Sequence, residues 1–242
     1  MINTPNPNSR FPSELVIECN KVVLIPYTHE HDEAVRRFMS CPITMKNLLF
    51  MAKRPNGWTL EEIQKRRMSR YEDQALGQRL DFIIAIKDEV LNTFKAKNIA
   101  NSKHDQFETL DKHTWPQDFQ IKSLQNSSYV VAGICGFNYA DFSSGKTEAG
   151  IIVDKAFWNY GVGTDSLMHL MKYAFEQLKL HKVIYATDTN NMQMRGWLEK
   201  VCPGSYSYTE KDSVYFDGKF SDYCFYTIYE TNWFDHVSKF LK

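Results

Sequence analysis

Two glycines one residue apart, Gly161 and Gly163, lie between an apolar run and an amphipathic helical pattern. Glycine lacks the side chain that would keep a ligand away from the backbone, so several N–H groups can point at one place. The helix that follows adds the positive end of its dipole there. Such an arrangement binds anions, and phosphates in particular. The segment therefore predicts a site for a ligand that carries a diphosphate.

The elements expected around this loop place its N–H groups at the edge of a sheet. The sequence predicts an apolar strand over 148–153 and, after the loop, a helix that Thr164 can cap. Apolar residues at helical spacing over 167–178 give this helix one buried face. A second strand over 183–186 ends in the polar run 188–191. Ligands of open α/β sheets bind at such strand ends.

A dinucleotide-binding fold is the first alternative to weigh. The run 161–166 departs from the G-x-G-x-x-G pattern because Ser166 stands at the third glycine, although Asp188 could imitate the acid that holds a ribose. A doubly wound sheet needs several further strand–helix repeats. Only one more clear strand follows Asp188, so this alternative is disfavoured.

Read with its flanks, the region resembles the GNAT superfamily of acetyl-CoA-dependent N-acetyltransferases, and within it the RimJ/RimL-like branch. The superfamily's cofactor motif, Gln/Arg-x-x-Gly-x-Gly/Ala, matches residues 158–163, with Trp158 in the first position. Further stretches resemble the motifs of the branch in the expected order: 22–28, 148–151, 188–191, 198–200, 217–222 and 226–228. The resemblance covers most of the chain.

This resemblance implies an α/β fold of the mixed α+β kind, with a central, mostly antiparallel mixed sheet flanked by helices. Residues 1–242 are expected to form a single domain, with a loose arm over 1–13 and a long insertion over 87–128 between two strands. The implied activity is direct acetyl transfer from acetyl-CoA, as co-substrate, to a primary amine of a small molecule or to a peptide N-terminus. No metal is implied.

The resemblance also assigns coenzyme-binding roles. The backbone of Ile151, Ile152 and Val153 would pair with the pantetheine arm, the N–H groups of 159–164 would hold the pyrophosphate, and Asn191 would bind near the thioester. The full set expected to bind the coenzyme is Ile151, Ile152, Val153, Trp158, Asn159, Tyr160, Gly161, Val162, Gly163, Thr164 and Asn191.

Three familiar catalytic groups of the superfamily are missing. The positions of a serine acid, a tyrosine acid and a carboxylate near the closing hairpin fall on Met194, Leu198 and Val214. A non-catalytic, acyl-CoA-binding or regulatory protein on the same scaffold is therefore the second functional hypothesis.

Acetyl transfer needs a route for the proton of the attacking amine. Glu148 begins the coenzyme-binding strand and could accept that proton directly or through a water molecule; Asp222 and Asp188 are the alternatives. A backbone N–H of the same strand could polarise the carbonyl without a side chain. A thiolate, with a pKa of roughly 8.5 for Cys-type thiols, leaves readily, so a dedicated acid is not obligatory.

Composition narrows the setting. The 242 residues have a formal net charge of zero, which gives no indication of a nucleic-acid partner. No apolar stretch reaches the length of a membrane span, and 1–13 lacks the apolar core of a signal peptide. The five cysteines show no C-x-x-C spacing, which favours a reducing, cytoplasmic location. Cys135 and Cys224 are expected to be buried; whether the protein is a homodimer stays open.

The remaining elements are expected as strands at 22–25, 80–86 and 129–137, helices at 29–40 and 59–74, a final helix at 192–200, and a hairpin of 213–215 with 221–229. His29, Glu30 and His31 have a spacing that suits a metal-binding strand, but they fall at a helix start, so a solvated first turn is expected there.

Overall fold

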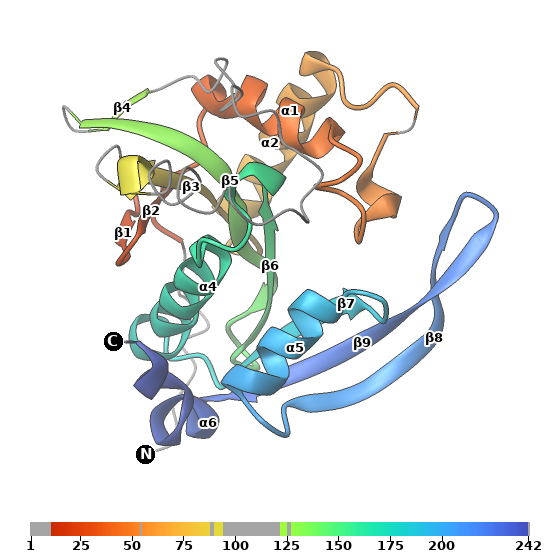
Figure 1. Ribbon diagram of the computed structural model, residues 1–242. Coiled ribbons are helices and arrows are strands. Elements are labelled where there is room, and N and C mark those ends of the chain that lie inside the picture. Colours follow the sequence, from red (N-terminus) through yellow and green to blue (C-terminus); the bar gives the residue numbers. More distant parts are fainter. Residues whose placement is uncertain (1–10, 54, 88–89, 94–121, 125–126, 242) are drawn as a thin grey trace.

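Apolar strands form one sheet whose strand order does not follow the sequence. The computed structural model describes residues 11–53, 55–87, 90–93, 122–124 and 127–241. The sheet runs in the order β1-β2-β3-β5-β6-β7-β9-β8, with β4 paired to β5 (Figure 1). Its strands are β1 (Ile17–Glu18), β2 (Val22–Pro26), β3 (Leu80–Lys87), β4 (Lys122–Leu124), β5 (Ser127–Asp141), β6 (Lys146–Val153), β7 (Lys182–Asp188), β8 (Tyr206–Phe216) and β9 (Lys219–Tyr229).

One pair of strands differs from the rest. Among the described strands, β6 and β7 are parallel and every other pair is antiparallel. The sheet is thus mixed and mostly antiparallel, as the family resemblance implies. The strands β3 and β5 pair directly, with Lys87 opposite Tyr129, so the chain between them is an insertion.

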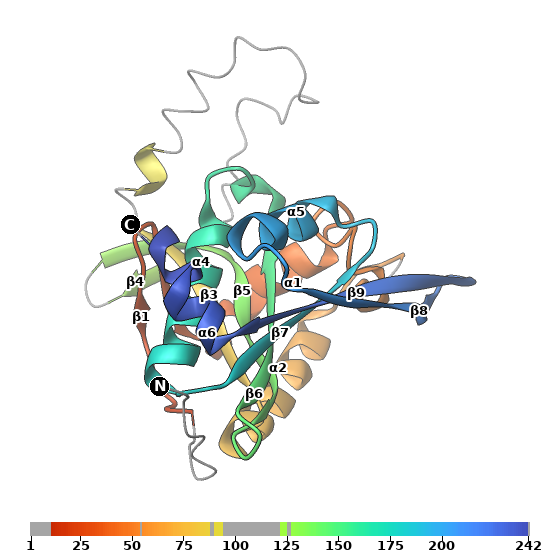
Figure 2. The same cartoon turned by 90° about the horizontal axis from the view of Figure 1, so that it is seen from below.

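Helices cover both faces of the sheet (Figures 1 and 2). Side chains alternate along each strand, so each face has its own core. One core contains Val23, Ile83 and Ile134 and packs under α1 and α2; the other contains Phe82, Phe137 and Tyr185 and packs under α4 and α6. The helices are α1 (Asp32–Ser40), α2 (Leu60–Ala75), α4 (Val162–Lys172), α5 (Met192–Val201) and α6 (Glu230–Asp235), with a π-helical turn, η4 (Tyr173–Gln177), after α4. The described ranges also contain four 3-10 turns: η1 (His29–His31), η2 (Leu49–Met51), η3 (Lys155–Phe157) and η5 (Val237–Phe240).

Local capping explains where two helices begin. Thr59 caps α2: its hydroxyl accepts a hydrogen bond from the Glu62 N–H, and the Glu62 carboxylate accepts one from the Thr59 N–H. The cap of α4 differs from the prediction, because Gly161 is the N-cap residue and Thr164 lies inside the first turn. Gly161 has a φ of 79°, which explains why glycine rather than threonine stands at that position.

Three other expectations need correction. His31 is buried rather than solvated, and its imidazole Nε2 hydrogen-bonds the Tyr129 hydroxyl at 2.8 Å, so it stabilises the packing of η1. The helix over 192–200 is not the last, because α6 follows β9. The first strand of the hairpin is longer than expected and begins at Tyr206.

Some expectations fall outside the described residues. Most of the arm over 1–13 and most of the insertion over 87–128 belong to this group. Cys135 and Cys224 are buried as predicted, and all five cysteines are free thiols.

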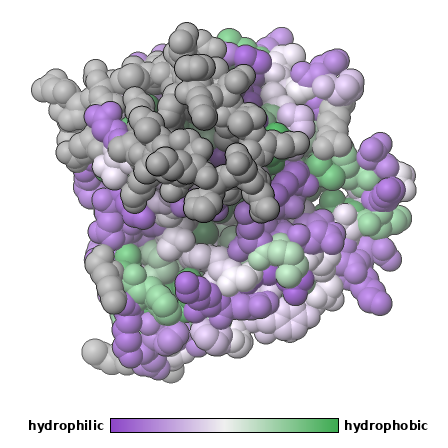
Figure 3. All heavy atoms as spheres, viewed as in Figure 1, coloured by the Kyte–Doolittle hydropathy of each residue, from purple (hydrophilic) through white to green (hydrophobic). Residues whose placement is uncertain are grey.

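The outer surface is mixed in character. Where Figure 3 draws described residues, hydrophilic side chains alternate with small hydrophobic patches. Within the described part of the chain, no helix has the length and apolar character needed to span a membrane.

Asp165 on α4 fixes this helix to the start of β2. Its carboxylate accepts hydrogen bonds from the backbone N–H groups of Lys21, Val22 and Asn20 at 2.6, 3.2 and 3.3 Å. Asp165→Ala should lower the free energy of unfolding by about 2–4 kcal/mol, since backbone donors next to the core lose a charged acceptor. Urea unfolding measures this change.

A matched control is Glu61→Ala, which removes a carboxylate whose side chain is 75% exposed and pairs with Lys65. This change should cost less than about 0.5 kcal/mol. Equal effects of the two substitutions would contradict the role of Asp165.

Candidate functional site

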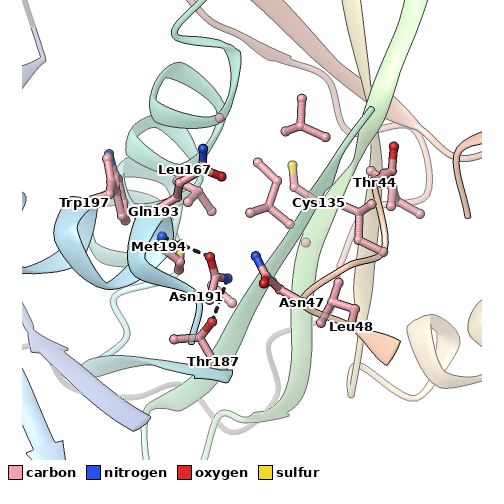
Figure 4. A pocket seen from close by; sticks show the side chains of 18 of the residues that line it. Thr44, Asn47, Leu48, Cys135, Leu167, Thr187, Asn191, Gln193, Met194 and Trp197 are labelled. Carbon is pink, nitrogen blue, oxygen red and sulfur yellow. Dashed lines mark hydrogen bonds between the residues drawn. The ribbon is translucent and has the colours of Figure 1, made fainter. Parts of the chain in front are cut away.

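The strands β6 and β7 separate partway along their length. Their parallel pairing ends at Glu148 and Ile184, whereas β5 stays paired with β6 as far as Val153. A cavity of about 580 Å³ opens at this separation, lined by residues of β6, of the loop before α4, and of the start of α5. Figure 4 shows Asn47 and Leu48 on one wall and Asn191, Met194 and Trp197 on the other.

The free edge of β6 offers backbone hydrogen-bonding groups to this cavity. Successive residues of a strand direct their N–H and C=O groups to opposite edges. The Asp154 N–H donates to the Ala132 carbonyl, and the Ile152 carbonyl lies against Gly133, so both residues use the β5 side. By the same alternation, Ile151 and Val153 face the separation. Of the three residues expected to pair with a ligand, Ile152 therefore directs its backbone groups to β5, and Ile151 and Val153 direct theirs to the separation.

Trp158 completes this edge. Its indole N–H donates to the Val153 carbonyl at 2.8 Å, which leaves the N–H of Val153 and both backbone groups of Ile151 directed at the cavity. The Lys46 ammonium lies 5.0 Å from the centre of the Trp158 ring, a cation–π contact that holds the ring against the strand. Trp158 thus acts on the strand edge as well as on the loop.

The loop before α4 concentrates backbone donors. Asn159 and Gly161 have φ values of 68° and 79°, which turn the chain sharply. The first intrahelical bond is donated by the Asp165 N–H to the Gly161 carbonyl. The N–H groups of 162–164 consequently have no intrahelical acceptor, which is the arrangement that the predicted anion site requires.

Lys21 adds a cation that sequence reasoning missed. Its ammonium donates to the Tyr160 carbonyl at 3.1 Å and lies 2.6 Å from the position that a Cβ of Gly161 would occupy. It comes from the segment before β2, far away in sequence. Its position directly before an apolar strand gave no signal that it would reach this loop.

Asn191 lies on the opposite wall and begins α5. Its side-chain oxygen accepts from the Met194 N–H at 3.3 Å, and its amide donates to the Thr187 hydroxyl at 2.9 Å (Figure 4). These bonds fix the orientation of the side chain. The amide group has two hydrogens, and the bond to Thr187 uses one of them. Met194 also lines the cavity, whereas Leu198 is fully buried in the core.

Glu148 lines the cavity on the sheet face covered by α1 and α2. It lies opposite Asn138 of β5, which lines the same cavity. Desolvation by burial raises the pKa of the Glu148 carboxyl, and the positive charge of Arg79 opposes this only partly. A carboxyl with a raised pKa in a cavity can exchange protons closer to neutral pH than an ordinary glutamate.

The other two carboxylates considered do not line this cavity. Asp222 accepts a hydrogen bond from the Asp212 N–H at 2.9 Å and stabilises the irregular part of β8. Asp188 accepts from the Asn190 N–H at 2.7 Å at the end of β7. The sequence-based hypothesis that Asp222 joins Glu148 is therefore not supported by its position.

Tyr223, the residue after Asp222, does line the cavity. Side chains alternate along β9, so Tyr223 faces the same side of the sheet as Glu148. Burial, and then the charges of Asp188 and Glu148, raise the pKa of Tyr223 to about 12, so its hydroxyl stays protonated at neutral pH. The alternation of side chains along the predicted strand 221–229 was the available sequence signal for the face on which Tyr223 lies.

The α1–α2 connection forms the roof on this side. The rings of Phe50 and Tyr223 contact each other with centroids 6.3 Å apart. Leu48, Met51, Arg66 and other residues also line this part of the cavity, which is thus apolar with a few charged groups. The cavity has two ends, on either side of the β6 edge. We call the loop before α4, residues 159–164, the anion loop, and the part lined by Leu48, Phe50, Met51 and Arg66 the roofed cleft.

One group could in principle hold a metal ion. Among the described residues, Cys19, Asp165 and His169 place ligand atoms within 4.8 Å of one another. The Asp165 carboxylate is already bound by backbone N–H groups, and burial raises the pKa of the Cys19 thiol, which disfavours the thiolate that a metal requires. These residues fit a structural junction better than a metal centre.

Comparison with known proteins gives a consistent result. Residues 21–201 match the acetyltransferase (GNAT) domain family. A curated relative, the uncharacterized N-acetyltransferase p20 of Bacillus licheniformis, is 30% identical over 61 residues, which make up 25% of this chain and 34% of the relative. The match thus spans about a third of that protein's length.

Solved structures share the fold at low sequence identity. A GCN5-related N-acetyltransferase from Brucella melitensis is 15% identical, with a TM-score of 0.66 over 97% of this chain and 86% of that one. The ribosomal L7/L12 α-N-protein acetyltransferase RimL, solved in complex with coenzyme A, is 16% identical, with a TM-score of 0.60 over 89% of this chain and 98% of that one.

Proposed function

The chain belongs to the acetyltransferase (GNAT) domain family, and from that premise we propose that it transfers the acetyl group of acetyl-CoA directly to a primary amine of a small molecule or a peptide N-terminus. The observation that carries this proposal is the cavity between the separated strands. One end of it offers backbone donors for a diphosphate, and the other contains a carboxyl with a raised pKa.

The coenzyme would occupy this cavity along its whole length. Its pyrophosphate fits the N–H groups at the start of α4, with the Lys21 ammonium close by. Its pantetheine arm fits the free edge of β6 at Ile151 and Val153, in the way that an added strand extends a sheet. Asn191, on the facing wall, supports the thioester end.

The chemistry then needs few side chains. The amine attacks the thioester carbonyl, whose developing charge the Ile151 N–H stabilises. The C–N bond forms, the C–S bond breaks, and Glu148 accepts the proton of the amine directly or through water. The protonated Tyr223 hydroxyl donates a hydrogen bond to the leaving thiolate, which takes its proton from solvent. Tyr223 thereby compensates for the groups absent at Met194 and Leu198.

A protein that binds acyl-CoA without turning it over is the second candidate. Met194, Leu198 and Val214 favour it, because none of these side chains can donate or accept a proton. Release of free thiol from acetyl-CoA with a panel of amines separates the two candidates.

The finer assignments follow from the same proposal. We place the protein in the RimJ/RimL-like branch, which its motifs resemble, and in the cytoplasm, where its five free thiols stay reduced. RimL acts on a ribosomal protein, and a peptide N-terminus is accordingly one acceptor class to test. Gel filtration decides between a monomer and a homodimer.

Gly163→Val should abolish tight binding of coenzyme A. A Cβ at Gly163 would lie 3.8 Å from the Val153 side chain and 3.9 Å from that of Ile151, so it fits the fold but enters the coenzyme's space. The dissociation constant should rise at least about tenfold, or about 1.4 kcal/mol, as measured by calorimetry. Gly196→Val is the matched control, because nothing beyond its chain neighbours and the backbone of α5 lies within 4 Å of its Cβ position. Unchanged binding by Gly163→Val would place the pyrophosphate elsewhere.

Glu148→Gln should lower kcat about 100-fold and remove one limb of the pH profile. A general base works in its ionised form. Because the pKa of Glu148 is raised, acidification protonates it at a pH above the ordinary glutamate pKa of 4.5. The wild-type kcat should therefore fall on the acid side with an apparent pKa above 4.5, and the variant should lack this fall. Asp222→Asn should keep it. Persistence of the acid limb in Glu148→Gln would exclude Glu148 as the base.

A further inference from the structure

The cations of α2 differ in whether a carboxylate neutralises them. Lys65 pairs with Glu61 at 2.7 Å, Arg67 with Asp32 at 2.9 Å, and Arg70 with Asp81 at 2.5 Å. Arg66 forms no ion pair with any residue of the described ranges. Because Arg66 lies between these paired residues in the sequence, the direction of its side chain explains why it forms no such ion pair.

The Arg66 side chain points into the roofed cleft. It is half-buried and lines the cavity together with Leu48, Phe50 and Met51. Its guanidinium lies 5.8 Å from the centre of the Trp58 ring, which supports one face of it. Burial, and next the repulsion from Arg70, lower the pKa of Arg66 to about 10. The charged form of Arg66 is thus destabilised in the cleft, and a bound anion would stabilise it.

Glu148 and Arg66 face the same compartment. Asp81, Gly136 and Gly150 are in register across β3, β5 and β6, and the Asp81 side chain lies on the face that α2 covers, where it binds Arg70. Two of these three are glycines, and a Cβ at Gly150 would meet only the Asn138 amide, at 3.6 Å. The two glycines leave this part of the floor without side chains, and Arg66 and Glu148 both line the cavity above it.

We propose that the acceptor amine carries a carboxylate, which Arg66 binds in the roofed cleft while Glu148 receives the proton of the amine. This inference rests on the proposed acetyl transfer and names its substrate class. The carboxylate could belong to a free amino acid or to an acidic side chain next to a peptide N-terminus, and both present the same chemistry to a guanidinium.

The charges of the cleft favour a carboxylate over a phosphate. A guanidinium binds a carboxylate through two parallel hydrogen bonds. A phosphate dianion would need a second uncompensated cation, and the neighbouring Arg70 is already bound to both oxygens of Asp81, at 2.6 and 2.5 Å. The Arg70–Asp81 ion pair lines the same cavity, and Leu48, Phe50 and Met51 supply its apolar surface near the α1–α2 connection.

The test uses matched pairs of amines with the full-length protein. One pair is an amino acid and its α-amide, and a second is a short peptide with Asp or Asn at its second position, so that the two sources of a carboxylate are separated. Steady-state kinetics of thiol release, with mass spectrometry of the products, gives KM and kcat for wild type, Arg66→Gln and Arg66→Lys. Lys65→Gln is the control, because it removes one positive charge from the same helix at a side chain that is 75% exposed.

The wild type should prefer the carboxylate-bearing member of at least one pair by about tenfold or more in kcat/KM. Arg66→Gln should lose this preference through a raised KM while it keeps its kcat for the neutral member. Arg66→Lys should restore part of it, and Lys65→Gln should match the wild type.

Two results would overturn the inference. If amines are acetylated without preference for the carboxylate, or if Arg66→Gln keeps the preference, the substrate class is wrong although acetyl transfer stands. If neither neutral nor anionic amines release thiol from bound acetyl-CoA, acetyl transfer and the substrate class both fail.

Discussion

The separation of β6 from β7 is the constraint on which the rest of the site depends. Backbone groups at a sheet edge need partners, and a strand edge inside a molecule is rarely left without them. Beyond Glu148 the edge of β6 faces a cavity instead of β7. An extended ligand with amide groups is the natural partner for such an edge. The same separation lets groups from both faces of the sheet reach one ligand, which a continuous sheet would prevent.

Position on a strand decides which of the carboxylates considered lines the cavity. Glu148 is the last residue of β6 that pairs with β7, so its side chain lies where the two strands begin to diverge. Asp222 and Tyr223 are neighbours in β9, yet they face opposite sides of the sheet, and Tyr223 alone of the two lines the cavity. A shift of β9 by one residue would thus place the Asp222 carboxylate in the cavity instead of the Tyr223 phenol.

The features that sequence predicted well are local ones. The strand, the glycine pair at 161 and 163, and the helix after them lie within one short segment, and their order fixes the anion loop. The contact of Lys21 with the Tyr160 carbonyl, and the places of Arg66 and Tyr223 in the cavity lining, could not be predicted from one segment, because these residues come from elements distant in sequence. Alternation along 221–229 predicts only the face of the sheet on which Tyr223 lies. The misplaced cap at Thr164 has a local cause: a hydroxyl suits a cap, but the left-handed backbone at the helix start requires glycine.

Acetyl transfer involves two proton transfers, one to the leaving thiolate and one from the attacking amine, and the missing side chains affect them unequally. A thiolate is stable enough to leave near neutral pH, so the loss of an acid at Met194 and Leu198 costs less than the loss of a base would. The amine is different, since its alkylammonium form cannot attack. A carboxylate in the cleft therefore matters more than an acid at the sulfur. On the proposed mechanism, Glu148, a cavity carboxyl with a raised pKa, would meet the demand for a base, and the Tyr223 phenol, whose pKa is raised to about 12, would serve only as a hydrogen-bond donor.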